Sequence, residues 1–357
     1  MQPRVDVNMM VYNCVDTVAA AIDSVLAQTW PDVTLTLIDN ASTDGTMAVL
    51  EDYADRHSGV RIRRNRCNAG PIANIQRAFW GGDADFVMPK TGDDLIAPDY
   101  IARLMEVLLA HPDTAMCHAG GEIFTAAGKV IHVYPPEHWL HAVGLDPVER
   151  AREVMWHYTS APSFWGVYRR GAVDQLSTIR YRPGFDHAVV AELALYGEIR
   201  HVPEVLYRRH GGGKPVMLIG RGATEAGNRN VPLDDDLAEQ RWRAPLITTA
   251  HTHLEVFAVA RLPQAQRTAL MRSAYEIFRA RWLPLFQREA AQLRAALPEL
   301  MERIATAEPI LAAWLTRSVG EVLLAAQTML PEAGFSGDIL SLSALSDEVS
   351  AGAAPVC

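Results

Sequence analysis

The stretch VTLTLIDNASTDGT, residues 33–46, indicates the fold class. Its first six residues alternate β-branched and apolar side chains, which is typical of a strand. Residues 39–45 are turn formers whose hydroxyl and carboxylate groups can cap a helix running from about Thr46 to Arg56. A strand that passes through a polar turn into a helix is the repeating unit of α/β proteins.

The same unit extends on both sides of this stretch. Further strands are expected at residues 5–11, 60–63 and 84–89, and further helices at residues 16–28, 71–80 and 98–110. Strands that alternate with helices predict a parallel sheet with helices on both faces. Ligands of such sheets bind at the carboxyl ends of the strands, so polar residues at those ends are candidate site residues.

Composition narrows the function classes. The chain has 357 residues and a net charge of -9, because 42 acidic residues outnumber 33 basic ones. This balance argues against a nucleic-acid binder. The four cysteines have no zinc-ligand spacing and are interpreted as free thiols of a reducing compartment. No signal peptide and no apolar run of roughly 18 residues is found, so a cytoplasmic protein without a membrane span is expected.

Two acidic sites follow predicted strands. Asp39 stands at a strand end, where it can accept a hydrogen bond from the ring N–H of a base. Lys90-Thr91-Gly92-Asp93-Asp94 follows the strand at 84–89. Adjacent carboxylates repel each other unless a cation or hydrogen bonds compensate, and Mg²⁺ in phosphate chemistry is held by one or two carboxylates plus substrate phosphates. A capped turn and a solvated acidic turn are the alternatives.

Six stretches taken together resemble the family 2 inverting glycosyltransferases of the GT-A fold. They are YNCVDTVAAAIDSVLAQTW (12–30), IDNASTDGT (38–46), NAGPIANIQRAF (68–79), GDDLIAPDY (92–100), FDH (185–187) and YRRHGGG (207–213). The resemblance covers roughly the first 210 residues. It implies an α/β fold with a mixed, mostly parallel sheet, a nucleotide-sugar donor, and Mg²⁺ or Mn²⁺ as cofactor.

The resemblance also implies roles for individual residues. The nucleotide would be bound by Asn13, Asp39, Asn68, Asn74, Asp93 and Arg208, with Asp39 on the uracil ring, Asp93 on the ribose and Arg208 facing phosphate. Asp94 would hold the metal. His210 would complete the metal shell or touch the diphosphate, a surface histidine being the alternative.

The chain departs from the family pattern at two of these places. Thr91 stands where the family often has an aspartate, which leaves a shortened acidic loop. The family often has an arginine near Ile75, so that Asn74 or Arg77 would have to supply one contact to phosphate or base.

Asp186 is the candidate general base. It lies in the region where the family carries the carboxylate that deprotonates the acceptor, with Phe185 in place of the first acid of the usual pair. A helix cap at the start of residues 187–196 is the alternative, and capping and catalysis can coincide. The residues expected to face the sugar or acceptor are Trp139, Trp165 and Gly166, with core packing as the alternative for the aromatic pair.

The predicted domains follow from the resemblance and from the helical periodicity. A catalytic domain is expected at 1–215, with a nucleotide-binding half at 1–112 and an acceptor half at 113–215; a flexible loop at 216–236; a helical domain at 237–330; and a disordered tail at 331–357. The apolar faces of the helical domain need burial, either against the catalytic domain or in a homodimer.

These observations predict a hexosyltransferase-type enzyme that moves a sugar from a UDP-sugar to a small-molecule or carrier-bound acceptor, with inversion and metal assistance. Secondary-metabolite and polysaccharide biosynthesis are both compatible with it. A sugar-1-phosphate nucleotidyltransferase is one alternative, although its Gly-rich loop with Arg and Lys is missing from residues 12–16, which read YNCVD. A non-catalytic sugar-nucleotide scaffold is the other.

Overall fold

The computed structural model describes residues 2–157, 161–177, 184–211 and 241–351. Their contacts define two compact units. The first contains the described residues of 2–177 together with 189–211 and 260–263, and the second contains 184–188, 241–259 and 264–351. The loop predicted at 216–236 lies outside the described residues.

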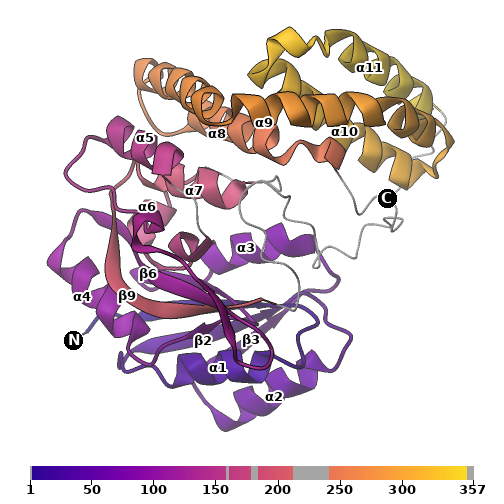
Figure 1. Cartoon of the computed structure of the whole chain (residues 1–357). Coiled ribbons are helices and arrows are strands. Elements are labelled where there is room, and N and C mark those ends of the chain that lie inside the picture. The colour runs from indigo at the N-terminus through magenta and orange to yellow at the C-terminus, as the bar shows by residue number, and fades with distance from the viewer. Residues whose placement is uncertain (1, 158–160, 178–183, 212–240, 352–357) are drawn as a thin grey trace. The chain divides into compact units, whose positions relative to one another are not determined.

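The N-terminal half of the first unit is built from the predicted strand–helix units. Its strands are β1 (Val5–Val11), β2 (Val33–Asp39), β3 (Val60–Arg64) and β4 (Phe86–Thr91), in the parallel order β3-β2-β1-β4. The helices that connect them are α1 (Val18–Leu26), α2 (Thr46–Arg56) and α3 (Gly70–Trp80). Figure 1 shows α1 and α2 on one face of the sheet and α3 on the other. The predicted α/β architecture is confirmed.

Mixed strands extend this sheet beyond β4. They are β8 (Val167–Arg169), β6 (Thr114–Phe124), β9 (Glu198–His210) and β5 (Leu95–Ile96), with β7 (Val130–Val133) paired to β6. β6 and β9 are parallel, whereas β8 is antiparallel to both β4 and β6. Three helices of this half are α4 (Tyr100–Ala110), α5 (Pro147–His157) and α6 (Arg170–Val173).

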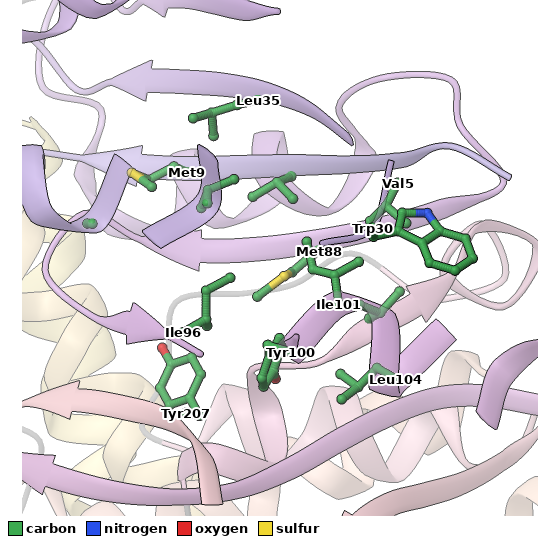
Figure 2. Close-up of a cluster of buried hydrophobic side chains, with 14 of the residues drawn as sticks. Val5, Met9, Trp30, Leu35, Met88, Ile96, Tyr100, Ile101, Leu104 and Tyr207 are labelled. Atoms are coloured by element: carbon green, nitrogen blue, oxygen red, sulfur yellow. The ribbon is translucent and has the colours of Figure 1, made fainter. Parts of the chain in front are cut away.

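A large apolar cluster lies between the sheet and helices α1 and α4 (Figure 2). Alternate residues of β1 and β4, such as Met9 and Met88, enter it and are fully buried. Burial of each such side chain contributes about 1.5–3 kcal/mol.

The opposite face of β1 carries two buried polar residues. Asp6 accepts hydrogen bonds from the backbone N–H groups of Asp83 and Ala84, and Asn8 donates to the carbonyls of Ala78 and Gly81. The two polar residues of this strand therefore fix the connection between α3 and β4 by hydrogen bonds.

The second unit is helical, as predicted. Its main helices are α8 (Pro245–Val259), α9 (Gln264–Thr306), α10 (Pro309–Met329) and α11 (Ser336–Ala351). The buried Glu289 of α9 accepts hydrogen bonds from the backbone N–H groups of Leu246 and Ile247 and so caps α8. Burial raises the pKa of Glu289 to about 7, although these two bonds oppose the shift.

The tail differs from the expected disorder at 331–357. Residues 336–351 form α11, and Phe335, which precedes it, is fully buried with the guanidinium of Arg294 4.5 Å from its ring. The composition pointed to disorder because Ser, Ala and Gly are frequent, but Phe335 and the buried Leu342 supply apolar contacts to this segment. Residues 352–357 lie outside the described part.

Candidate active site

The loops after β1 and β2 are joined by hydrogen bonds. The side-chain carbonyl of Asn13 accepts from Thr43 N at 2.9 Å, and Asn13 N donates to Ser42 Oγ at 3.0 Å. Asn13 has a φ of 46°, a left-handed conformation that asparagine tolerates better than most residues. Cys14 N donates in addition to Thr46 Oγ1 at 2.9 Å. The two loops therefore form one rigid rim at the carboxyl end of the sheet.

Asp39 lies at the end of β2 and is fully buried. Ser42 N donates to both carboxylate oxygens, at 3.1 and 3.2 Å. Arg64, at the end of β3, approaches Asp39 Oδ2 with its Nε at 3.2 Å. The candidate base-binding carboxylate is thus already oriented by its own turn and by the neighbouring strand.

Four asparagines connect the ends of β2 and β3 to the start of α3. Asn40 donates to Asn68 Oδ1 at 2.6 Å, and Asn65 donates to Asn40 Oδ1 at 2.8 Å and to Asn74 Oδ1 at 2.7 Å. Asn74 donates in turn to the carbonyl of Ile38 at 3.3 Å. The structure therefore brings Asn68 and Asn74 together, and their contact with a nucleotide stays a prediction. Sequence reasoning missed Asn40 and Asn65, although both directly follow strands.

The acidic loop after β4 is held by β9. Asp94 is buried; its Oδ1 accepts from His210 N at 2.8 Å, and its Oδ2 accepts from the hydroxyl of Tyr207. Asp93 is partly exposed. Burial and the adjacent charge of Asp94 raise the pKa of Asp93 to about 6. The charges of the two carboxylates therefore repel each other, while the hydrogen bonds from Tyr207 and His210 orient Asp94.

Lys90 lies fully buried beneath this loop, in β4. The strand ends at Thr91 rather than at residue 89, so Lys90 belongs to the strand and not to the loop. Its Nζ donates to the carbonyl of Thr91 at 3.2 Å and to the carbonyl of Asp94. Burial lowers the pKa of Lys90 to about 8, against the opposing charges of Asp94 and Asp93. A lysine in the apolar pattern of a strand was the signal that sequence reasoning overlooked.

The end of β9 brings basic residues to the same loop. Arg208 Nε donates to Glu122 Oε1 at 2.6 Å, and its guanidinium lies 4.8 Å from the ring centre of Phe124. The ring of His210 packs edge-on against Phe124 at 5.3 Å. The predicted phosphate ligand Arg208 is therefore paired with a carboxylate.

Arg209 follows on the strand face that also carries Tyr207. Burial lowers the pKa of Arg209, but Tyr134 and Asp94 outweigh this effect and raise it. Sequence reasoning did not select Arg209, which the structure places under the electrostatic influence of Asp94.

The carboxylate oxygens of this loop could bind a divalent ion only together with oxygens of a substrate. Within the described residues, no group of three or more His, Cys, Asp or Glu side chains could hold a metal by itself. Each oxygen of Asp94 accepts one protein donor, and a carboxylate oxygen has further lone pairs. One or two carboxylates completed by substrate phosphates is a common arrangement for Mg²⁺.

Comparison with known proteins supports the expected family. Residues 6–177 match the family model described as Glycosyl transferase family 2. This region belongs to glycosyl transferase family 2. The chain is 31% identical over 127 residues to the putative glycosyltransferase EpsE of Bacillus subtilis, a match that covers 35% of this chain and 46% of that protein. It is 25% identical over 196 residues to the uncharacterized glycosyltransferase YibD of Escherichia coli, over 52% of this chain and 53% of that one. The chain thus spans about half the length of these curated relatives.

Solved structures show the same fold. The S. aureus TarS 1-349 structure in complex with UDP-GlcNAc has a TM-score of 0.55 at 14% identity and covers 98% of this chain and 92% of that one. The TarS 1-349 structure without a named ligand has a TM-score of 0.54 at 13% identity, with 91% and 90% covered. The expected GT-A fold is therefore confirmed. None of the described helices is long and apolar enough to span a membrane.

The three residues expected to face the sugar or acceptor all make contacts within the protein. Trp139 donates from Nε1 to the carbonyl of Tyr134 at 3.0 Å, and its ring lies against Gly120, where any side chain would collide with it. Gly166 packs equally closely on the backbone of Cys117, and the carbonyl of Trp165 accepts from the hydroxyl of Tyr100. Packing explains Trp139 and Gly166, and contact with a sugar stays a prediction for all three.

Asp186 lies in the first turn of α7 (Phe185–Leu193) and is partly exposed. Contacts assign this turn to the helical unit, whereas the rest of α7 belongs to the first unit. The adjacent His187 is buried, and its Nδ1 lies 2.7 Å from Nε2 of His253 in α8. The helical unit therefore holds the turn that carries the candidate base, and its catalytic role stays a prediction.

Proposed function

We propose that this family 2 glycosyltransferase moves a sugar from a UDP-sugar to a small-molecule or carrier-bound acceptor, with inversion and with Mg²⁺ or Mn²⁺. The observation that carries the proposal is the placement of Asp39 at the end of β2 and of Asp93 and Asp94 after β4. Both strands pair with β1, so their ends are about 10 Å apart, given a strand spacing of about 4.8 Å. One nucleoside diphosphate can reach both places.

The donor would be held from base to diphosphate. Asp39 accepts the ring N–H of uracil, Asp93 binds the ribose, and Asn13, Asn68 and Asn74 line the pocket. The neighbour TarS was solved with UDP-GlcNAc, which supports a UDP-sugar as the donor class. Asp94 would hold the divalent ion, with His210 beside it, and Arg208 would face phosphate. When bound, the ion supplies positive charge to the leaving diphosphate.

Transfer would occur in one displacement. Asp186 takes the proton of the acceptor hydroxyl, whose oxygen attacks the anomeric carbon as the bond from that carbon to the diphosphate oxygen breaks. A single attack from the opposite side inverts the configuration. The sugar and acceptor would lie near Trp139, Trp165 and Gly166.

The proposal also includes the cellular compartment, the pathway and the role of the helical unit. The reaction would take place in the cytoplasm, within secondary-metabolite or polysaccharide biosynthesis. The helical unit would serve in packing and assembly, and a homodimer is one arrangement that would bury its apolar faces.

Release of UDP from a panel of UDP-sugars, with Mg²⁺ or Mn²⁺ and no acceptor, tests this function. We expect slow hydrolysis of at least one donor, its loss in D94N and its retention in D83N. Asp83 is a suitable control because its side chain is 89% exposed and pairs with Arg4. UDP binding without any release would instead indicate a non-catalytic scaffold, and formation of UTP and sugar 1-phosphate from the UDP-sugar and added pyrophosphate would indicate a nucleotidyltransferase.

A further inference from the structure

The ion pair between Asp39 and Arg64 lies where the base of the donor is expected. The two residues face each other across the last register position of the parallel strands β2 and β3. Asp39 is fully buried, whereas the side chain of Arg64 is 51% exposed. A base that approaches Asp39 from solvent will therefore meet the guanidinium of Arg64.

Arg64 uses only part of its hydrogen-bonding capacity on the protein. Its Nε lies 3.2 Å from Asp39 Oδ2, and its Nη2 donates to the carbonyl of Ser42 at 3.3 Å. A guanidinium has five N–H donors in a rigid plane. No further hydrogen bond of Arg64 is found within the described ranges, so donors remain for a ligand beside Asp39.

The pair presents one acceptor and one donor side by side. Asp39 Oδ2 is shared with Arg64, while Ser42 N approaches both oxygens of the carboxylate. Uracil offers a ring N–H flanked by two carbonyls, so the N–H can bond to Asp39 while one carbonyl accepts from Arg64. Guanine offers a ring N–H with a carbonyl on one side and an amino group on the other, so that the N–H and the amino group together form two adjacent donors that can bind both oxygens of one carboxylate.

We propose that Arg64 determines base specificity: together with Asp39 it favours uracil and disfavours guanine in the donor nucleotide. Either carbonyl of uracil can accept a hydrogen bond from the guanidinium, whereas the amino group of guanine cannot. Two-point binding of guanine to the carboxylate would also place one of its two donors at Oδ2, against the N–H groups of Arg64. This inference rests on the proposed binding of a nucleotide sugar at Asp39.

Calorimetric titration with UDP and with GDP, in Mg²⁺, tests the role of Arg64. The variants are R64M, which removes all donors at similar length, and R64K, which keeps a countercharge for Asp39 but loses the planar fork. R63M is the matched control, because Arg63 is an exposed neighbour on the same strand.

We expect the ratio of UDP to GDP affinity to fall about ten- to a hundredfold in R64M, the range of one two-point base contact, and to fall by a smaller factor in R64K. R63M should keep the wild-type ratio. A wild-type ratio in R64M, or in R64K should R64M fail to fold, would overturn the inference while leaving the proposed function intact. Absence of UDP binding by the wild-type chain would instead refute the proposed function itself.

Discussion

Replacing Tyr207 by Phe removes one hydroxyl from beneath the candidate metal ligand Asp94. Tyr207 is fully buried in the apolar cluster (Figure 2), and its hydroxyl donates to Asp94 Oδ2. A hydrogen bond to a charged group contributes about 1.5–3 kcal/mol, and the carboxylate that loses it is itself buried. We therefore expect the free energy of unfolding to fall by about 2 kcal/mol. Because the bond from His210 N to Oδ1 remains, the carboxylate should stay in the site but lose its fixed orientation.

Y207F should also weaken ligand binding, whereas the same substitution at a comparable buried tyrosine should not. Partners that orient a metal-binding group typically change metal affinity ten- to a hundredfold, so Y207F should weaken metal-dependent UDP binding by that factor. Tyr100 provides the control: it is fully buried, its ring centre lies 6.1 Å from that of Tyr207, and its hydroxyl donates to the backbone carbonyl of Trp165. Y100F should cost about 1 kcal/mol and leave UDP binding unchanged.

Urea unfolding and calorimetric titration with UDP, in Mg²⁺ and in chelator, measure both effects. The reasoning is refuted if Y207F binds UDP as wild type does in Mg²⁺, or if Y100F weakens metal-dependent binding by the same factor.

Three further predictions concern other parts of the chain. D186N should lower turnover about 10²–10⁴-fold with unchanged UDP affinity, because the amide cannot take a proton; near wild-type transfer would move the base elsewhere, with Glu192 or His187 next. Lys90 has a pKa of about 8 in the folded chain against an ordinary value of 10.5, so between these pH values the folded chain has lost the proton while the unfolded chain still binds it. The free energy of unfolding of wild type relative to K90M should therefore rise by up to about 3 kcal/mol as the pH increases through this range. Parallel pH curves of the two proteins in urea unfolding would contradict this. Removal of residues 237–357 takes away His253, against which the buried His187 of α7 packs, and should therefore cause aggregation; a soluble, fully active monomer in size-exclusion chromatography would disprove it.

The first half of the fold could be predicted because its strands and helices have distinct periods. The strand at 5–11 was recognised despite Asp6 and Asn8, since the other side chains are apolar. The second half was irregular in sequence for a physical reason. β6 and β9 pair with register shifts near Gly120, and β5 has only two residues, so neither a clean alternation nor a turn signal marks them.

The site could be predicted only in part. Position at a strand end singles out Asp39 and Asp94, because that position follows from local sequence alone. Their partners do not: Tyr207 is 113 residues from Asp94 along the chain, and only the folded sheet brings them together. Arg64 cannot be selected from the sequence either, since no local pattern shows that its register partner is Asp39.

Metal-dependent binding of UDP by the full chain tests the central claim most directly. The experiment is a calorimetric titration with UDP in Mg²⁺ or Mn²⁺, repeated in excess chelator and with D94N. We predict saturable binding in the presence of metal, with a loss of at least about tenfold both in chelator and in D94N, because Asp94 and the diphosphate would share the ion. Equal binding with and without chelator would contradict the role of the metal, and a clear preference for a guanine or thymine nucleotide would contradict the choice of UDP.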